Sequence, residues 1–134
     1  MLRELVEAGH EVSVPISGSS MLPFLAGGRD TAYFRAPWRE LTVGDIVFFR
    51  RAGGEYILHR ICAVNEGGFL CVGDSQLNPE QVSRGQIFGL VTKVRRKGKS
   101  LEPGDLVWDF FAGFWLRALP RRERLLKLAS MLNI

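Results

Sequence analysis

Short runs of β-forming residues, separated by glycine-containing turns, constrain the fold of this chain more than any other feature. The runs are Glu11–Ile16, Asp30–Arg35, Asp45–Phe49, Tyr56–Val64, Phe69–Val72 and Gln86–Val94. Strands that follow one another without helices between them are typical of all-β domains. The segment Asn65-Glu66-Gly67-Gly68, between the fourth and fifth runs, predicts a tight hairpin turn.

Helices are expected only at the two ends of the chain. Residues 2–8 predict a short helix, and residues 121–132 predict a basic amphipathic helix. A chain of 134 residues forms one ordinary domain. We therefore expect a single, mainly β domain over residues 1–134, with a β core at about 11–95 and a helical extension at about 105–134.

Charge is unevenly distributed along the chain. Residues 1–92 carry 8 basic and 10 acidic side chains, whereas residues 93–134 carry 10 basic and 4 acidic ones, for a net charge of +4. All the lysines lie in the second part, so residues 1–92 contain none. A basic C-terminal portion can bind nucleic acid or an anionic membrane surface, or can simply favour solubility.

The pattern of apolar residues bears on localisation. Acidic residues near the start of the chain stand where a signal peptide would have an apolar run. The longest apolar run, Phe110–Leu116, is far shorter than the roughly 18 residues needed to cross a bilayer. We expect a cytoplasmic protein. The aromatic residues of 105–119 and the basic helix after them either pack on the sheet or make peripheral contact with a membrane.

A candidate nucleophile lies in the loop after the first expected strand, in the segment Gly18-Ser19-Ser20-Met21-Leu22-Pro23. A serine hydroxyl is a poor nucleophile unless a neighbouring base takes its proton. Where a strand gives way to a loop, the backbone N–H of Ser20 can also face a developing oxyanion. From this segment alone, an ordinary turn serine is the alternative.

Five short motifs occur in a definite order along the chain. They are Ser20-Met21-Leu22-Pro23, Gly44–Phe49, His59-Arg60-Ile61, Gly73-Asp74 and Ile87–Val91. In this order they resemble the superfamily of serine peptidases that includes signal peptidase I and the self-cleaving domain of the LexA repressor, over about residues 11–95. The resemblance implies a domain of coiled antiparallel sheets. It also implies a serine endopeptidase that cleaves an extended segment of a partner protein and needs no metal or other cofactor.

The resemblance also implies a base for the serine. Members of the superfamily use a Ser–Lys dyad or, in the endoplasmic-reticulum type of signal peptidase, a Ser–His pair. No lysine precedes Lys93, and His59 stands where the base is expected. We therefore predict Ser20 as the nucleophile and His59 as the general base and then the general acid. The candidates for substrate or oxyanion contacts are Gly18, Ser19 and Met21.

The hairpin register predicts an acid that orients the imidazole. A turn symmetric about residues 66–67 pairs Val64 with Phe69, Cys62 with Cys71 and His59 with Asp74. Asp74 then accepts a hydrogen bond from the ring, and the base titrates with an apparent pKa of about 6 to 7.5. A bulge would change this register by one residue. Glu80 is the alternative orienting acid, because the endoplasmic-reticulum type carries a second acid nearby.

Three functions remain open at this point. The first is a peptidase that binds its peptide or protein substrate as an added strand beside the one before Ser20. The second is an inactive, peptide-binding relative, because Gly18 stands where signal peptidase I usually has a serine that helps the oxyanion hole. The third is a basic nucleic-acid-binding module, supported only by residues 93–127. DNA binding is not expected, since the DNA-binding domain of LexA is missing.

Overall fold

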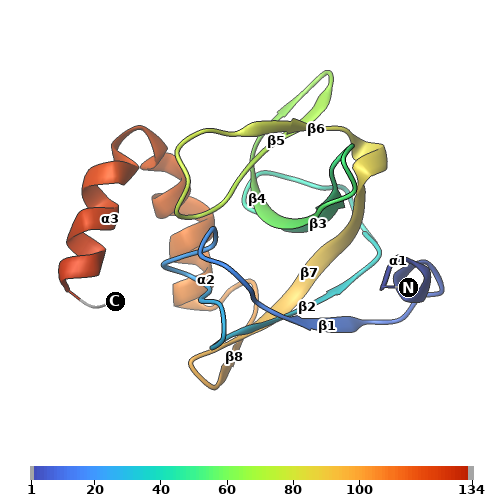
Figure 1. The fold of residues 1–134 in the computed structure, drawn as a ribbon, viewed down its shortest axis with the longest axis horizontal. Helices are drawn as coiled ribbons and strands as arrows, with labels where there is room; N and C mark the ends of the chain where they lie inside the picture. Colours follow the sequence, from blue (N-terminus) through green and yellow to red (C-terminus); the bar gives the residue numbers. More distant parts are fainter. Residues whose placement is uncertain (1, 133–134) are drawn as a thin grey trace.

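Eight strands form one antiparallel sheet in the computed structural model, which describes residues 2–132. The strands are β1 (Val12–Pro15), β2 (Thr31–Arg35), β3 (Ile46–Arg50), β4 (Tyr56–Asn65), β5 (Gly68–Val72), β6 (Glu80–Val82), β7 (Ile87–Arg96) and β8 (Lys99–Leu101). Their order is β1-β2-β7-β3-β4-β5-β6, and β8 pairs with β7 (Figure 1). The expected mainly β fold is confirmed.

Helices occur at the two ends of the chain, as expected. They are α1 (Leu2–Glu7), α2 (Leu106–Phe110), the π-helical turn η2 (Phe111–Trp115), the short 3-10 turn η3 (Leu119–Arg121) and α3 (Arg122–Met131). A further 3-10 turn, η1 (Arg84–Gln86), lies between β6 and β7. In Figure 1, α1 lies at one end of the molecule, and α2 and α3 lie at the other. No helix within residues 2–132 is long and apolar enough to cross a membrane.

The sheet is strongly coiled, and both of its faces are buried near the middle. Phe48 of β3 packs into one core, with α1, α2 and η2, whereas Val47 and Phe49 of the same strand pack into a second core beneath β5 and β6. Successive side chains of a strand point to opposite faces, so the continuous apolar run of β3 serves both cores. Irregularities in the pairing of β7 with β2 and β3 add curvature.

The β4–β5 hairpin follows the expected register only near its turn. Val64 pairs with Phe69 as predicted, but a bulge at Cys62 shifts the rest, so that Ile61 pairs with Cys71. At the bulge the Cys62 thiol donates a weak hydrogen bond to the Leu70 carbonyl, at 3.3 Å. The predicted pairing of Cys62 with Cys71 is therefore wrong, and the predicted pairing of His59 with Asp74 is wrong for the same reason.

The C-terminal helices are tied to the turn that follows β5. The indole N–H of Trp115 donates to the Asp74 carbonyl at 2.7 Å. Arg122, at the start of α3, is fully buried and donates to the carbonyls of Gly73 (3.0 Å) and Gln76 (2.9 Å). These bonds fix the helical extension against the same turn that supports the loop of Ser20.

Candidate active site

The loop that carries Ser20 is held at both ends and from beneath. It leaves β1 at Ile16, whose N–H donates to the Asp30 carbonyl at 2.9 Å just before β2 begins. Met21, Phe24 and Leu25 are buried in the first core and anchor the middle of the loop. The apolar residues after Ser20 therefore turn the chain inward and leave the serine itself half-buried.

The turn after β5 braces this loop directly. Ser75 donates its N–H to the Ser20 carbonyl (3.0 Å) and its hydroxyl to the Ser19 carbonyl (2.7 Å). Gly73 approaches so closely that a Cβ there would collide with the Ser20 carbonyl oxygen. A glycine is required at this point because only a residue without a side chain permits such an approach. Ser19 thus acts through its backbone, in holding the loop.

Ser20 and His59 line one pocket of about 400 Å³. The pocket lies beside β1 and between the Ser20 loop and the strands β3 and β4. Its lining residues are Val14, Pro15, Ile16, Ser17, Ser20, Met21, Phe48, Tyr56, Ile57, Leu58 and His59. The fold therefore brings Ser20, Met21 and His59 together. Gly18 and Ser19 are exposed in the adjoining loop. Within residues 2–132, no hydrogen bond joins the Ser20 hydroxyl to the imidazole.

The imidazole of His59 is buried and only 2% exposed, and its Nδ1 has no hydrogen-bond partner within residues 2–132. Burial lowers the pKa of His59 to about 4; Glu80 opposes this shift and Arg51 adds to it. The ring is consequently neutral at pH 7 and can accept a proton. This value lies below the range of about 6 to 7.5 expected for the base, because that expectation did not include the loss of solvation on burial.

Asp74 does not orient the imidazole. Both of its carboxylate oxygens accept hydrogen bonds from Arg60, each at 2.9 Å, and both side chains are fully buried. Arg60 also donates to the Gly44 carbonyl at 2.9 Å. The bulge at Cys62 aligns Arg60 with Val72, the last residue of β5. Asp74, just beyond the end of β5, therefore contacts Arg60 and not His59. Asp74 supports the turn beneath Ser20.

Glu80, the alternative acid, is the carboxylate beside His59. Its Oε1 lies 3.8 Å from Nδ1 of the ring. Arg51 holds this carboxylate with two hydrogen bonds, at 2.6 and 2.9 Å, and they lower the pKa of Glu80. Glu80 is therefore ionised at neutral pH. It can stabilise an imidazolium electrostatically, although 3.8 Å is too long for a direct hydrogen bond.

Sequence reasoning missed several residues of this site. Ser17 and Tyr56 line the pocket, and Ser75 holds the loop. Ser75 directly follows the Gly73-Asp74 motif, so that motif carried a usable signal. Nothing local predicts the Arg51–Glu80 pair, because Arg51 lies in the loop between β3 and β4 and Glu80 begins β6, 29 residues later.

The described residues do not favour cysteine or metal chemistry at this site. Burial raises the pKa of Cys62 and raises that of Cys71 to about 12, so neither free thiol is an activated nucleophile. Within the described part of the chain, no cluster of three or more His, Cys, Asp or Glu side chains could hold a metal ion. Three residues with hydroxyl groups (Ser17, Ser20 and Tyr56) and one imidazole (His59) therefore line the pocket.

Comparisons with known proteins do not assign this chain. No protein-family model matches it, and comparisons with curated proteins and with solved structures also found no match. The resemblance to the signal peptidase and LexA superfamily stays a prediction from the ordered motifs. The functional argument accordingly depends on the geometry of the pocket.

Proposed function

We propose that this protein is a serine endopeptidase in which Ser20 is the nucleophile and His59 is the general base. The observation that carries the proposal is that two residues far apart in sequence line one pocket, where burial keeps the imidazole neutral. A neutral imidazole beside a hydroxyl is the arrangement that nucleophilic catalysis by serine requires. The ordered motifs support the same assignment.

The proposed reaction proceeds in two halves. The Ser20 hydroxyl attacks the scissile carbonyl and passes its proton to His59, and the imidazolium then protonates the leaving amine. Water hydrolyses the resulting acyl-enzyme, with His59 again taking the proton. Glu80, at 3.8 Å from the ring, favours the transient imidazolium. The two side chains are not hydrogen-bonded within residues 2–132, so the reaction requires the Ser20 hydroxyl and the imidazole to approach each other.

The substrate is proposed to be an extended polypeptide segment. β1 lies at the edge of the sheet and, within the described residues, pairs only with β2. Its last residues and the loop after it line the pocket. A peptide that adds to this edge as a further strand would pass the pocket with alternate side chains pointing into it. Ile16, Met21 and Phe48 favour an apolar side chain there.

Labelling with a serine-directed phosphonate tests this proposal. We expect one phosphonyl group on Ser20, located by mass spectrometry, and no labelling of Ser20→Ala. Ser17→Ala is the matched control, because Ser17 lines the same pocket and should leave the labelling rate unchanged. Unchanged labelling of Ser20→Ala, or labelling of Ser17 in its place, would contradict the proposal.

Peptide binding without hydrolysis is the second candidate function. It is favoured by the missing hydrogen bond between Ser20 and His59 within residues 2–132. A peptide-library experiment separates the two candidates. Saturable peptide binding, together with no cleavage and no phosphonate labelling of the folded protein, would establish the second candidate and exclude the first.

A further inference from the structure

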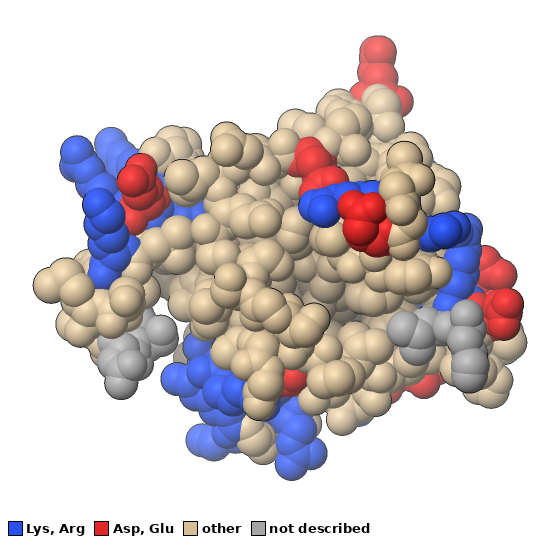
Figure 2. Space-filling view, in the orientation of Figure 1, with Lys and Arg blue, Asp and Glu red and all other residues tan. Residues whose placement is uncertain are grey.

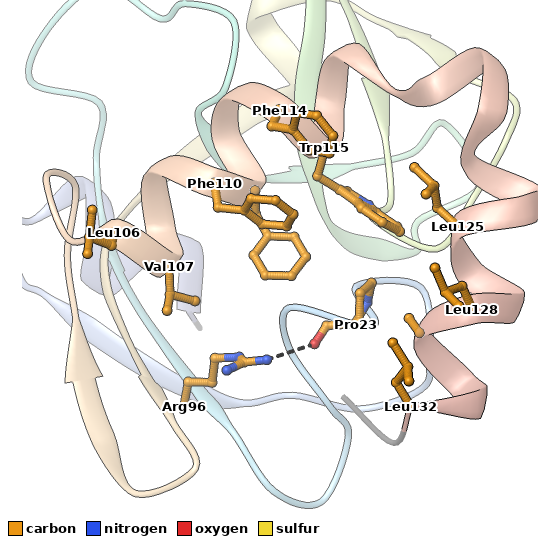
Figure 3. A pocket seen from close by; sticks show the side chains of 12 residues that line it. Pro23, Arg96, Leu106, Val107, Phe110, Phe114, Trp115, Leu125, Leu128 and Leu132 are labelled. Atoms are coloured by element: carbon orange, nitrogen blue, oxygen red, sulfur yellow. Dashed lines mark hydrogen bonds between the residues drawn. The ribbon is translucent and has the colours of Figure 1, made fainter.

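A groove between the C-terminal helices exposes large apolar side chains on one surface. The groove has a volume of about 420 Å³ and lies between α2–η2 on one side and α3 on the other (Figure 3). Phe110 and Phe114 stack on one wall, with ring centroids 5.3 Å apart, and Leu125 and Leu128 project from the facing helix. Trp115 and Phe111 form the buried floor.

The rim of this groove projects into solvent. The exposed fractions are 90% for Leu106, 60% for Leu132, 59% for Phe114, 50% for Leu128 and 44% for Phe110. Scattered apolar residues are ordinary on a protein surface, but a contiguous set around one groove marks an interaction site. The sequence left open whether the 105–119 segment packs on the sheet or contacts a membrane. The structure divides it, with Trp108, Phe111 and Trp115 buried and with Leu106, Phe110 and Phe114 exposed.

Exposed cations flank the groove. Arg95, Lys97 and Lys99 lie on the β7–β8 hairpin, and Arg117, Arg121, Arg124 and Lys127 lie on or beside η3 and α3. None of these residues forms an ion pair within residues 2–132. Figure 2 shows one group of basic side chains over the start of α3 and another over β8, and further basic side chains beside acidic ones on the right.

Arg96 is not one of these free cations. Its side chain enters the groove but donates to the carbonyls of Phe24 (2.7 Å) and Pro23 (3.2 Å). These bonds join β7 to the Ser20 loop and make Arg96 a structural part of the groove wall. The charges available to a ligand are therefore those of the rim.

We propose that this face, the apolar groove with its two basic flanks, docks on an anionic lipid bilayer. Apolar side chains that project from a rim can enter the acyl boundary, while flanking Lys and Arg side chains reach the lipid headgroups. A partner helix seated in the groove would leave the rim residue Leu106, which is 90% exposed, projecting beyond it. A bilayer surface covers the projecting tips and both basic groups at once. This proposal does not depend on the peptidase assignment.

Vesicle co-flotation of the whole protein is the test. The probes are vesicles of phosphatidylcholine alone and of phosphatidylcholine with 30% phosphatidylglycerol. We expect binding to the anionic vesicles that weakens at least tenfold on neutral vesicles and weakens again between about 0.1 and 0.5 M salt, because each rim cation near the surface contributes about fivefold. Absence of binding to anionic vesicles at 0.1 M salt would overturn the proposal.

Matched variants locate the docking face. Two double variants should each weaken binding to anionic vesicles at least tenfold, with the circular dichroism spectrum and the melting temperature unchanged. One is Leu106→Glu with Phe114→Glu, and the other is Arg121→Glu with Arg124→Glu. Two control variants should change vesicle binding less than threefold. One is Val64→Glu, at an exposed apolar residue of β4, and the other is the charge-matched Arg35→Glu with Arg84→Glu. Equal losses in the controls would overturn the proposal. So would salt-dependent binding to an oligonucleotide, or self-association through the groove, in place of vesicle binding.

Discussion

At the residue scale, the buried pair of Arg60 and Asp74 supports the candidate site without taking part in its chemistry. The two side chains are fully buried and joined by two hydrogen bonds. Around them, Arg60 reaches the Gly44 carbonyl and Trp115 reaches the Asp74 carbonyl. The pair thus connects β4, the loop before β3, the turn beneath Ser20 and the C-terminal helices.

Breaking this pair should destabilise the whole protein. Asp74→Asn leaves an uncompensated buried guanidinium, so we expect the free energy of unfolding, measured with urea, to fall by about 3–5 kcal/mol. The double variant Arg60→Met with Asp74→Leu removes both charges and should lose less than Asp74→Asn. If Asp74→Asn keeps its full stability but loses phosphonate labelling, Asp74 acts in the chemistry and our assignment is wrong.

His59 should make stability depend on pH in a definite direction. Its pKa is about 4 in the folded protein, against 6.5 for an ordinary histidine. Between these two pKa values the unfolded chain binds a proton that the folded chain does not. The neutral imidazole therefore contributes its full share of the free energy of unfolding above pH 6.5, and this share is lost as the pH falls toward 4. The expected loss is up to about 3 kcal/mol.

The measurement compares urea unfolding of the parent and of His59→Gln from pH 7 to pH 4. The stability difference between the two proteins should shrink as the pH falls, because the glutamine does not titrate. Parallel curves would show that the imidazole is not held neutral by burial.

Glu80 should affect the candidate reaction more than its neighbour Glu55 does. Both carboxylates lie beside Arg51, but only Glu80 is near the imidazole, at 3.8 Å. Glu80→Gln should slow phosphonate labelling about tenfold, since it removes a charge that favours the imidazolium. Glu55→Gln should leave the rate within twofold. Equal rates for the two variants would remove Glu80 from the site.

At the scale of elements, the turn after β5 sets the position of the nucleophile loop. A Cβ at Gly73 would collide with the Ser20 carbonyl oxygen, whereas Gly85 has open space around its Cα. We expect Gly73→Ala to lower the free energy of unfolding by about 1–3 kcal/mol and to slow labelling of Ser20. Gly85→Ala should do neither. If Gly73→Ala is as stable and as reactive as the parent, the turn does not position the loop.

The strands that could be predicted are those with strong local patterns. The β3 run and the β4–β5 turn carry their signals within a few residues, and the structure has both. The bulge at Cys62 has no such signal, because it depends on how β4 fits its neighbours. Because of this bulge, Asp74 pairs with Arg60 and not with His59. β6 and β8 are three residues each and are set by pairing with longer strands.

At the scale of the whole molecule, the order of the motifs predicted the proximity of Ser20 and His59, but it did not predict the partner of Asp74 or the electrostatics of the pocket. Ser20 and His59 do line one pocket. The low pKa of His59 arises from burial of its ring, which only the assembled sheet creates. The candidate site and the apolar groove also meet in three dimensions, since Pro23 of the Ser20 loop lines the groove.

The pH dependence of phosphonate labelling tests the central claim most directly. If His59, with its pKa of about 4, is the base for Ser20, the second-order labelling rate should be flat from about pH 5.5 to 8 and fall below pH 5. His59→Gln should reduce the rate by roughly 10² to 10⁴ with the fold intact by circular dichroism. A rate that still rises between pH 7 and 8, or that survives in His59→Gln, would contradict the account.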